Sequence, residues 1–122
     1  MHATFKSDAS SDKVSSIGYR KLKELNLSRL VLGTVQFGIK YGVANQTGKP
    51  QIHEVMDILQ QAIEGGVNCL DTAPSYGESE EVIGRCLKEM GLLDSVYVLT
   101  KVRPITDGLP QKEGEKLVVD SV

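Results

Sequence analysis

Short apolar segments alternate with amphipathic helical segments along most of this chain, and this alternation restricts the possible folds more than any other feature of the sequence. The clearest helix is predicted over 52–64, between Pro50 and the pair Gly65-Gly66, which are typical start and stop signals. Its apolar residues recur at the spacing of one helix face: Ile52, Val55, Met56, Leu59, Ala62 and Ile63. A second amphipathic helix is predicted over about 79–90, with Gly91 just after it.

Three short apolar segments are interpreted as strands, near residues 30–33, 67–71 and 96–100, and the first of them as a buried strand. The two helices separate these strands, and residues 112–122 begin another helical pattern. Nearly continuous apolar strands that alternate with helices are typical of a parallel sheet. Both doubly wound sheets and (β/α)8 barrels begin in this way, and periodicity alone does not separate them.

The composition is ordinary for a soluble globular protein and predicts neither a nucleic-acid nor a membrane partner. The chain of 122 residues has a formal net charge of −2, and no apolar run approaches the roughly 20 residues of a membrane span. Residues 1–16 are polar and lack an apolar core, so we predict a disordered lead rather than a secretory signal. Cys69 and Cys86 are then expected to be free thiols, which favours a cytoplasmic location, and their separation from any histidine predicts no metal site.

Three polar residues follow the predicted strands at points where parallel α/β folds place their chemistry. Asp71 ends the second strand, Tyr76 lies in the loop after it, and Lys101 follows the third strand. A lysine ammonium beside a tyrosine phenol favours the phenolate, and an aspartate beside the lysine keeps it charged and in place. Such a tyrosine could donate a proton to a carbonyl oxygen while a hydride arrives at the carbon.

Each of these residues also has an ordinary structural interpretation. An aspartate after a strand often caps a turn, a lysine there is usually solvated, and a loop tyrosine usually packs with its hydroxyl in water. Their joint position at one edge of neighbouring strands favours a functional group over three unrelated residues.

The same residues carry a family resemblance. Leu32-Gly33-Thr34, the stretch Asp71-Thr72-Ala73-Pro74-Ser75-Tyr76-Gly77, and Leu99-Thr100-Lys101-Val102 resemble the aldo-keto reductase family in order and spacing. The resemblance covers about Tyr19 to Val102. It implies the N-terminal portion of a (β/α)8 TIM barrel, about three of its eight β/α units.

The resemblance also implies roles for individual residues. Asp71, Tyr76 and Lys101 would be catalytic: Asp71 orients Lys101, which in turn makes Tyr76 a better acid. Gly33, Thr34 and Asp71 would bind the cofactor NADPH, with Thr34 near the nicotinamide ribose. The loop from Gln36 to Tyr41 would face the substrate.

One catalytic group and most of the barrel are not found in this sequence. The family's fourth catalytic residue is a histidine, whereas the two histidines here are His2, in the lead, and His53, interpreted as a surface residue. A (β/α)8 barrel needs roughly 250 residues, so we interpret residues 17–122 as an incomplete barrel truncated at its C-terminus. We call the complete protein to which it would belong the parent protein.

The parent protein is expected to be an NADPH-dependent oxidoreductase that reduces aldehydes or ketones, with a small-molecule carbonyl compound as substrate. The fragment alone is expected to be inactive. The alternative is a non-catalytic role, because the family that the sequence resembles includes regulatory subunits, and a truncated copy could be inert.

Overall fold

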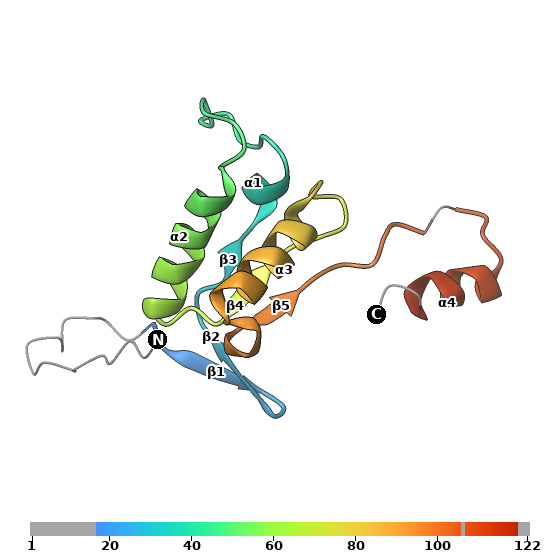
Figure 1. Ribbon diagram of the computed structural model, residues 1–122. Coiled ribbons are helices and arrows are strands. Elements are labelled where there is room, and N and C mark those ends of the chain that lie inside the picture. Colours follow the sequence, from blue (N-terminus) through green and yellow to red (C-terminus); the bar gives the residue numbers. More distant parts are fainter. Residues whose placement is uncertain (1–16, 106, 120–122) are drawn as a thin grey trace, which may run out of the picture.

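The computed structural model describes residues 17–105 and 107–119 (Figure 1). The predicted disorder of residues 1–16 concerns residues outside those described. In chain order the elements are β1 (Tyr19–Leu22), β2 (Leu25–Ser28), β3 (Leu32–Gly33), α1 (Val35–Gly38), α2 (Ile52–Glu64), β4 (Cys69–Asp71), α3 (Ser79–Met90), the 3-10 turn η2 (Leu93–Ser95), β5 (Tyr97–Leu99) and α4 (Gln111–Val119). Within the described ranges, none of the helices has the length and apolar character needed to cross a bilayer.

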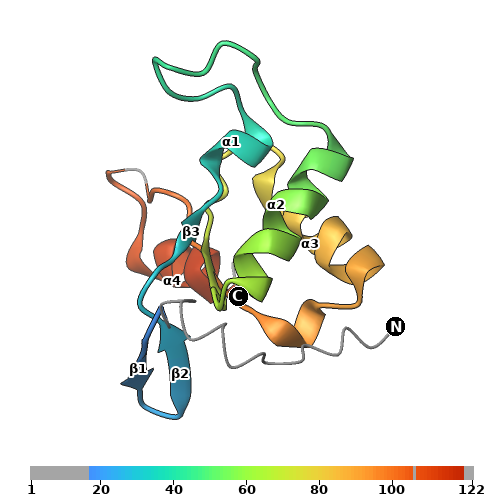
Figure 2. The ribbon, with the colours of Figure 1, turned by 90° about the vertical axis from the view of Figure 1, so that its left-hand side faces the viewer.

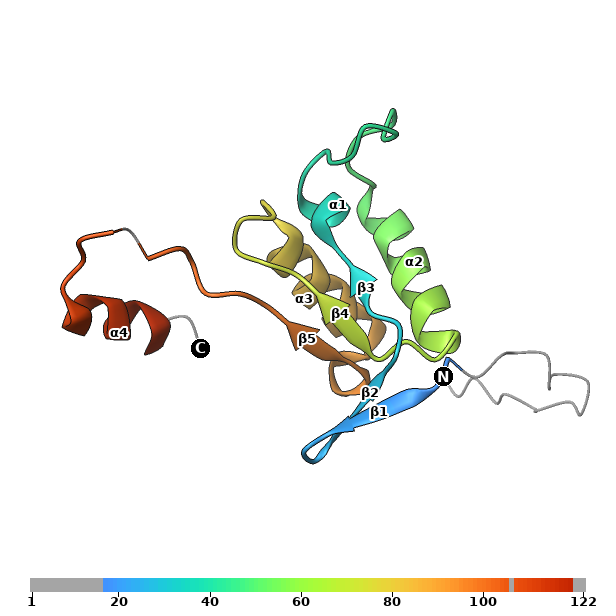
Figure 3. The ribbon, with the colours of Figure 1, turned by 180° about the vertical axis from the view of Figure 1, so that it is seen from behind.

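A three-stranded parallel sheet forms the centre of the structure, in the order β3-β4-β5. The prediction of three parallel strands in sequential order is therefore confirmed. Helices α2 and α3 lie side by side against one face of this sheet (Figure 1), and the view from behind shows the strands on the near side with both helices beyond them (Figure 3). This is the arrangement of consecutive β/α units in the wall of a barrel.

The hydrophobic core lies between the sheet and these two helices. From β4, Leu70 meets Val55 and Leu59 of α2 in this core, and all three side chains are fully buried. The remaining core residues are Phe37, Val82, Ile83, Cys86 and Leu87. Burial of each large apolar side chain contributes about 1.5–3 kcal/mol, so the predicted helix faces are what hold the helices on the sheet.

Both long helices begin and end where the sequence predicts. At the start of α2, the side chains of Gln51 and Glu54 form a reciprocal capping box, in which Glu54 accepts the Gln51 backbone N–H at 2.7 Å. At the end of α3, Gly91 adopts a left-handed conformation with φ of 69°, which glycine reaches without steric cost. Signals in the local sequence were therefore sufficient to predict where these two helices begin and end.

The first strand differs from its prediction as a buried strand over 30–33. Only Leu32–Gly33 pairs with a neighbour, and Leu30 and Val31 are 59% and 47% exposed. The reason is that β3 pairs only with β4 in the described part of the chain and so lies at an open edge. The apolar side chains of Leu30 and Val31 are therefore not buried by the other described residues.

A β-hairpin that the sequence analysis did not predict precedes the sheet. Strands β1 and β2 pair antiparallel and lie below β3 in Figure 2, at the end of β3 away from α1. The Asn68 side chain accepts the Ser28 N–H at 2.7 Å and donates to the Asn26 carbonyl at 2.8 Å. Asn68 immediately precedes β4, so the hairpin covers the amino ends of the strands, opposite to the predicted site.

Candidate active site

Asp71 and Lys101 form an ion pair at the carboxyl ends of β4 and β5. The register pairs Asp71 with Leu99, and Lys101 lies two residues further on, so both side chains project from the same face. The Lys101 Nζ donates to both carboxylate oxygens of Asp71, at 3.0 and 3.1 Å, and to the backbone carbonyl of Thr72 at 3.0 Å. The predicted pairing of these two groups is confirmed.

Lys101 also contacts Tyr76. Its Nζ lies 5.1 Å from the centroid of the Tyr76 ring, in the geometry of a cation–π contact. The hydrogen bonds to Asp71 raise the pKa of Lys101 above its ordinary value, and the electrostatic attraction of Asp71 adds to this effect. The lysine therefore stays charged beside the aromatic ring, and the structure brings all three predicted catalytic residues together.

The position of Tyr76 depends on a close backbone contact between two glycines. Gly38 ends α1, and a Cβ atom there would lie 1.6 Å from the Tyr76 carbonyl oxygen. In return, a Cβ atom on Gly77, whose φ is +59°, would lie 2.7 Å from the Gly38 carbonyl oxygen. Only glycine allows these segments to approach so closely. Sequence analysis missed this role of Gly38, and the signal available was its place within the loop expected to face the substrate.

The predicted cofactor residues occupy different environments. Gly33 is exposed and lies in register with Asp71, so both backbones border the same surface. Thr34, in contrast, is 0% exposed, and its hydroxyl donates to the Asp71 carbonyl at 2.8 Å. Its side chain thus lies behind the surface formed by the described residues, and the contact of Thr34 with the cofactor stays a prediction.

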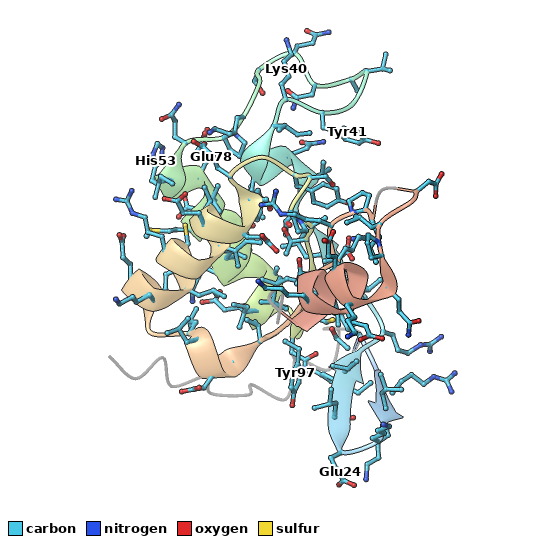
Figure 4. The ribbon with its side chains drawn as sticks, turned by 90° about the vertical axis from the view of Figure 1, so that its right-hand side faces the viewer. Glu24, Lys40, Tyr41, His53, Glu78 and Tyr97 are labelled. Carbon is cyan, nitrogen blue, oxygen red and sulfur yellow. The ribbon has the colours of Figure 1, made fainter. Side chains whose placement is uncertain are left out.

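The loop expected to face the substrate is only partly exposed. Phe37 belongs to the hydrophobic core, whereas Lys40 and Tyr41 extend into solvent (Figure 4). Beyond this loop, Lys49 forms a hydrogen-bonded ion pair with Glu78, and the hydrogen bond lowers the pKa of the Glu78 carboxyl. The segment that follows the loop is therefore held to Glu78, which lies two residues after Tyr76 in the sequence. His53 lies exposed on the first turn of α2, as predicted (Figure 4).

The two cysteines are free and buried, as expected for thiols without a partner. Burial raises the pKa of both Cys69 and Cys86, so both remain protonated and weakly reactive. Neither contributes a nucleophile to the site.

The site is open to solvent in the described part of the chain. The side chains of Lys101 and Asp71 are 50% and 39% exposed. A shallow pocket of about 280 Å³ adjoins Lys101, lined by Ala73, Pro74, Ser75, Lys101, Val102, Arg103 and Pro104. Pockets that enclose a small ligand usually measure about 300–1,000 Å³, so these residues form one wall of a site rather than a closed cavity.

The fold and the site define a class of protein: part of a parallel β/α barrel with an aspartate–lysine pair at the carboxyl ends of its strands. The chain belongs to the aldo/keto reductase family, whose sequence model matches residues 29–120. Its structure matches part of that family's TIM barrel. It superposes on the crystal structure of a Pseudomonas aeruginosa protein assigned to the aldo-keto reductases, with a TM-score of 0.60 and 35% identity, over 83% of this chain and 37% of that one.

Two sequence relatives illustrate the range of proteins that this chain is similar to. The aldo-keto reductase YhdN of Bacillus subtilis is 33% identical over 79 residues, which cover 63% of this chain and 22% of the relative. A protein of Arabidopsis thaliana named "Probable voltage-gated potassium channel subunit beta" is 34% identical over 83 residues, or 66% of this chain and 24% of the relative. The chain thus spans about a fifth to a quarter of the length of these relatives.

Proposed function

We propose that the parent protein is an NADPH-dependent oxidoreductase that reduces aldehydes or ketones to alcohols. The observation that carries the proposal is the Asp71–Lys101 ion pair, with the Lys101 ammonium over the ring of Tyr76. We further propose that the protein is cytoplasmic, that its substrate is a small carbonyl compound, and that residues 17–122 are the first part of its barrel domain.

In this proposal Tyr76 donates the proton that a carbonyl oxygen needs as it becomes a hydroxyl group. The Lys101 ammonium stabilises the phenolate that remains, and Asp71 keeps Lys101 charged and in place. Proton donation by a positioned side chain contributes roughly 10²–10⁴-fold to a reaction rate. All three groups are supplied by this chain.

The residues present fit a nicotinamide cofactor. They form a proton-donating group, and no amino-acid side chain can supply the accompanying hydride, which NADPH provides when bound. Gly33 and Asp71 border the exposed surface next to Lys101 and would hold the nicotinamide end. A glycine at this point leaves room for close approach, since nothing lies within 4 Å of a Cβ atom built on Gly33.

The test follows NADPH absorbance with the parent protein and a reactive aromatic aldehyde. For Tyr76→Phe we expect kcat/KM to fall by roughly 10²–10⁴-fold, because the proton donor is lost while the ring remains. Tyr97→Phe is the matched control: it removes the same hydroxyl from a tyrosine at the start of β5, away from Lys40 and Tyr41 (Figure 4), and should retain full activity. Full activity of Tyr76→Phe would refute the assigned role.

A second candidate function is a non-catalytic, regulatory role. It is favoured by the similarity to the Arabidopsis thaliana protein that is named as a channel subunit. A parent protein that binds NADPH but never oxidises it, with any aldehyde or ketone offered, would support this second function.

A further inference from the structure

Three hydroxyl groups are buried together behind the site. They belong to Thr34 at the end of β3, Thr72 at the end of β4 and Ser79 at the first residue of α3, and all three residues are 0% exposed. Figure 4 labels Glu78, the residue immediately before Ser79. We call these three residues the hydroxyl cluster.

The hydroxyl cluster is a closed hydrogen-bond network. The Thr72 hydroxyl donates to Ser79 Oγ at 3.0 Å, Ser79 donates to the Thr34 carbonyl at 2.9 Å, and Thr34 donates to the Asp71 carbonyl at 2.8 Å. A hydroxyl group can donate only one hydrogen bond, so these three bonds use the hydroxyl protons of all three residues. Ser79 Oγ and Thr34 Oγ1 lie 2.9 Å apart within it. The network therefore fixes the mutual positions of β3, β4 and α3.

Each proposed catalytic residue is attached to this network. The Asp71 carbonyl accepts from both the hydroxyl and the backbone N–H of Thr34, at 2.8 and 3.1 Å. The carbonyl of Thr72 is one of the acceptors that hold the Lys101 ammonium. On the other side, the backbone N–H of Ser79 donates to the Tyr76 carbonyl at 3.1 Å. The cluster thus connects to the backbone of Asp71 and Tyr76 and to the acceptor that binds Lys101.

Packing alone does not require hydroxyl groups at these positions. The neighbouring core consists of apolar side chains, and valine has the same β-branched shape as threonine without the hydroxyl. Buried hydroxyl groups need partners, and the described residues leave no buried side-chain nitrogen or oxygen atom without one. A network of this kind favours one arrangement of its backbone segments over slightly displaced ones.

We propose that Thr34, Thr72 and Ser79 are positioning residues, whose hydroxyl network sets the placement of the Asp71–Lys101 pair relative to Tyr76. The inference rests on the proposed function, because it concerns the same three groups. It goes beyond that function in assigning their alignment to side chains that do not reach the surface of the site.

The test compares Thr72→Val with Thr72→Ser in the parent protein. Valine removes the hydroxyl and keeps the shape, whereas serine keeps the hydroxyl and removes a methyl group. We expect Thr72→Val to lower kcat by about tenfold, since small misplacements of reacting groups are costly, and to leave the dissociation constant for NADPH unchanged. Thr72→Ser should stay within about twofold of the native kcat, since it keeps the positioning hydroxyl.

A second readout does not depend on activity. The pKa of Lys101, followed by NMR of its side chain, is raised in the native protein by the bonds to Asp71. Thr72→Val should move it toward the ordinary lysine value, and Thr72→Ser should not. If Thr72→Val does not fold, Thr34→Val removes another hydroxyl of the same network, with the same expected direction.

The outcomes separate this inference from the proposed function. If the native parent protein never oxidises NADPH, the proposed function fails, while the Lys101 titration still tests the placement of the pair. An unchanged kcat and Lys101 titration in Thr72→Val would overturn the inference. So would a loss in Thr72→Ser as large as in Thr72→Val, because packing would then explain both.

Discussion

The isolated 122-residue chain should not turn over carbonyl substrates with NADPH, although it carries Asp71, Tyr76 and Lys101. Hydride transfer requires the cofactor and the carbonyl carbon to be held at near-attack distance, and alignment of this kind accounts for about 7–11 kcal/mol of a barrier. The described residues supply only one wall around Lys101. A cofactor held at one end should bind weakly.

Solvent exposure further reduces the catalytic ability expected of the isolated chain. Because the side chains of Lys101 and Asp71 are 50% and 39% exposed, the surrounding water screens the charges that act between them and on Tyr76. The open edges of β3 and β5 should also favour association between chains over a single ordered state. Proton donation by Tyr76 therefore loses the shaped, partly dry surroundings that it needs.

The measurement compares the 122-residue chain with the parent protein, at equal concentrations, in the NADPH absorbance assay. The chain should give no rate above the background without protein. Turnover by the chain comparable to that of the parent protein would show that the remaining barrel is not needed for activity.

Gly38→Ala in the parent protein should disable the site and destabilise the fold. The added methyl group would lie 1.6 Å from the Tyr76 carbonyl and 2.6 Å from the Ser79 N–H, both of them backbone groups. Either α1 or the loop that carries Tyr76 has to move by more than about 1 Å to relieve the clash, and a displacement of that size can lower a rate by about 10²-fold. Overpacking at this level also lowers the free energy of unfolding by about 3 kcal/mol.

Gly84→Ala is the matched control for this substitution. Gly84 lies within α3, and nothing is found within 4 Å of a Cβ atom built on it. Alanine there should raise the free energy of unfolding by roughly 0.5–1 kcal/mol, the helix-propensity difference, and leave kcat/KM unchanged. Chemical denaturation and the NADPH assay measure both effects. Native stability and activity in Gly38→Ala would show that the contact with Tyr76 yields without cost.

The elements that sequence analysis predicted correctly are those with local signals. Helix 52–64 has an apolar face and glycines at its end, and the strand ending at Asp71 is bounded by polar residues. The hairpin of β1 and β2 was missed because its turn contains Lys23, with φ of 53°, in place of the glycine or asparagine that usually marks such turns.

The candidate site was predictable only in part, for a related reason. Polar residues after strands can be located along the sequence, so Asp71, Tyr76 and Lys101 were identified. The contact of Gly38 with Tyr76 and the burial of Thr34 depend on segments far apart in the chain, which periodicity does not bring together. Thr34 was therefore assigned to the cofactor surface, although its hydroxyl faces the interior.

The sequential strand order has a consequence for how such a barrel assembles during synthesis. Within the β3-β4-β5 sheet, β4 and β5 each pair with the strand made just before them, so a growing chain can add units at one edge without rearranging the others. In the proposed parent barrel the next unit would cover the β5 edge, whereas the β3 edge would stay open until the last strand closed the ring. Because β3 pairs over only Leu32–Gly33, the edge that would stay open longest offers only a short stretch of backbone for unwanted pairing with other chains.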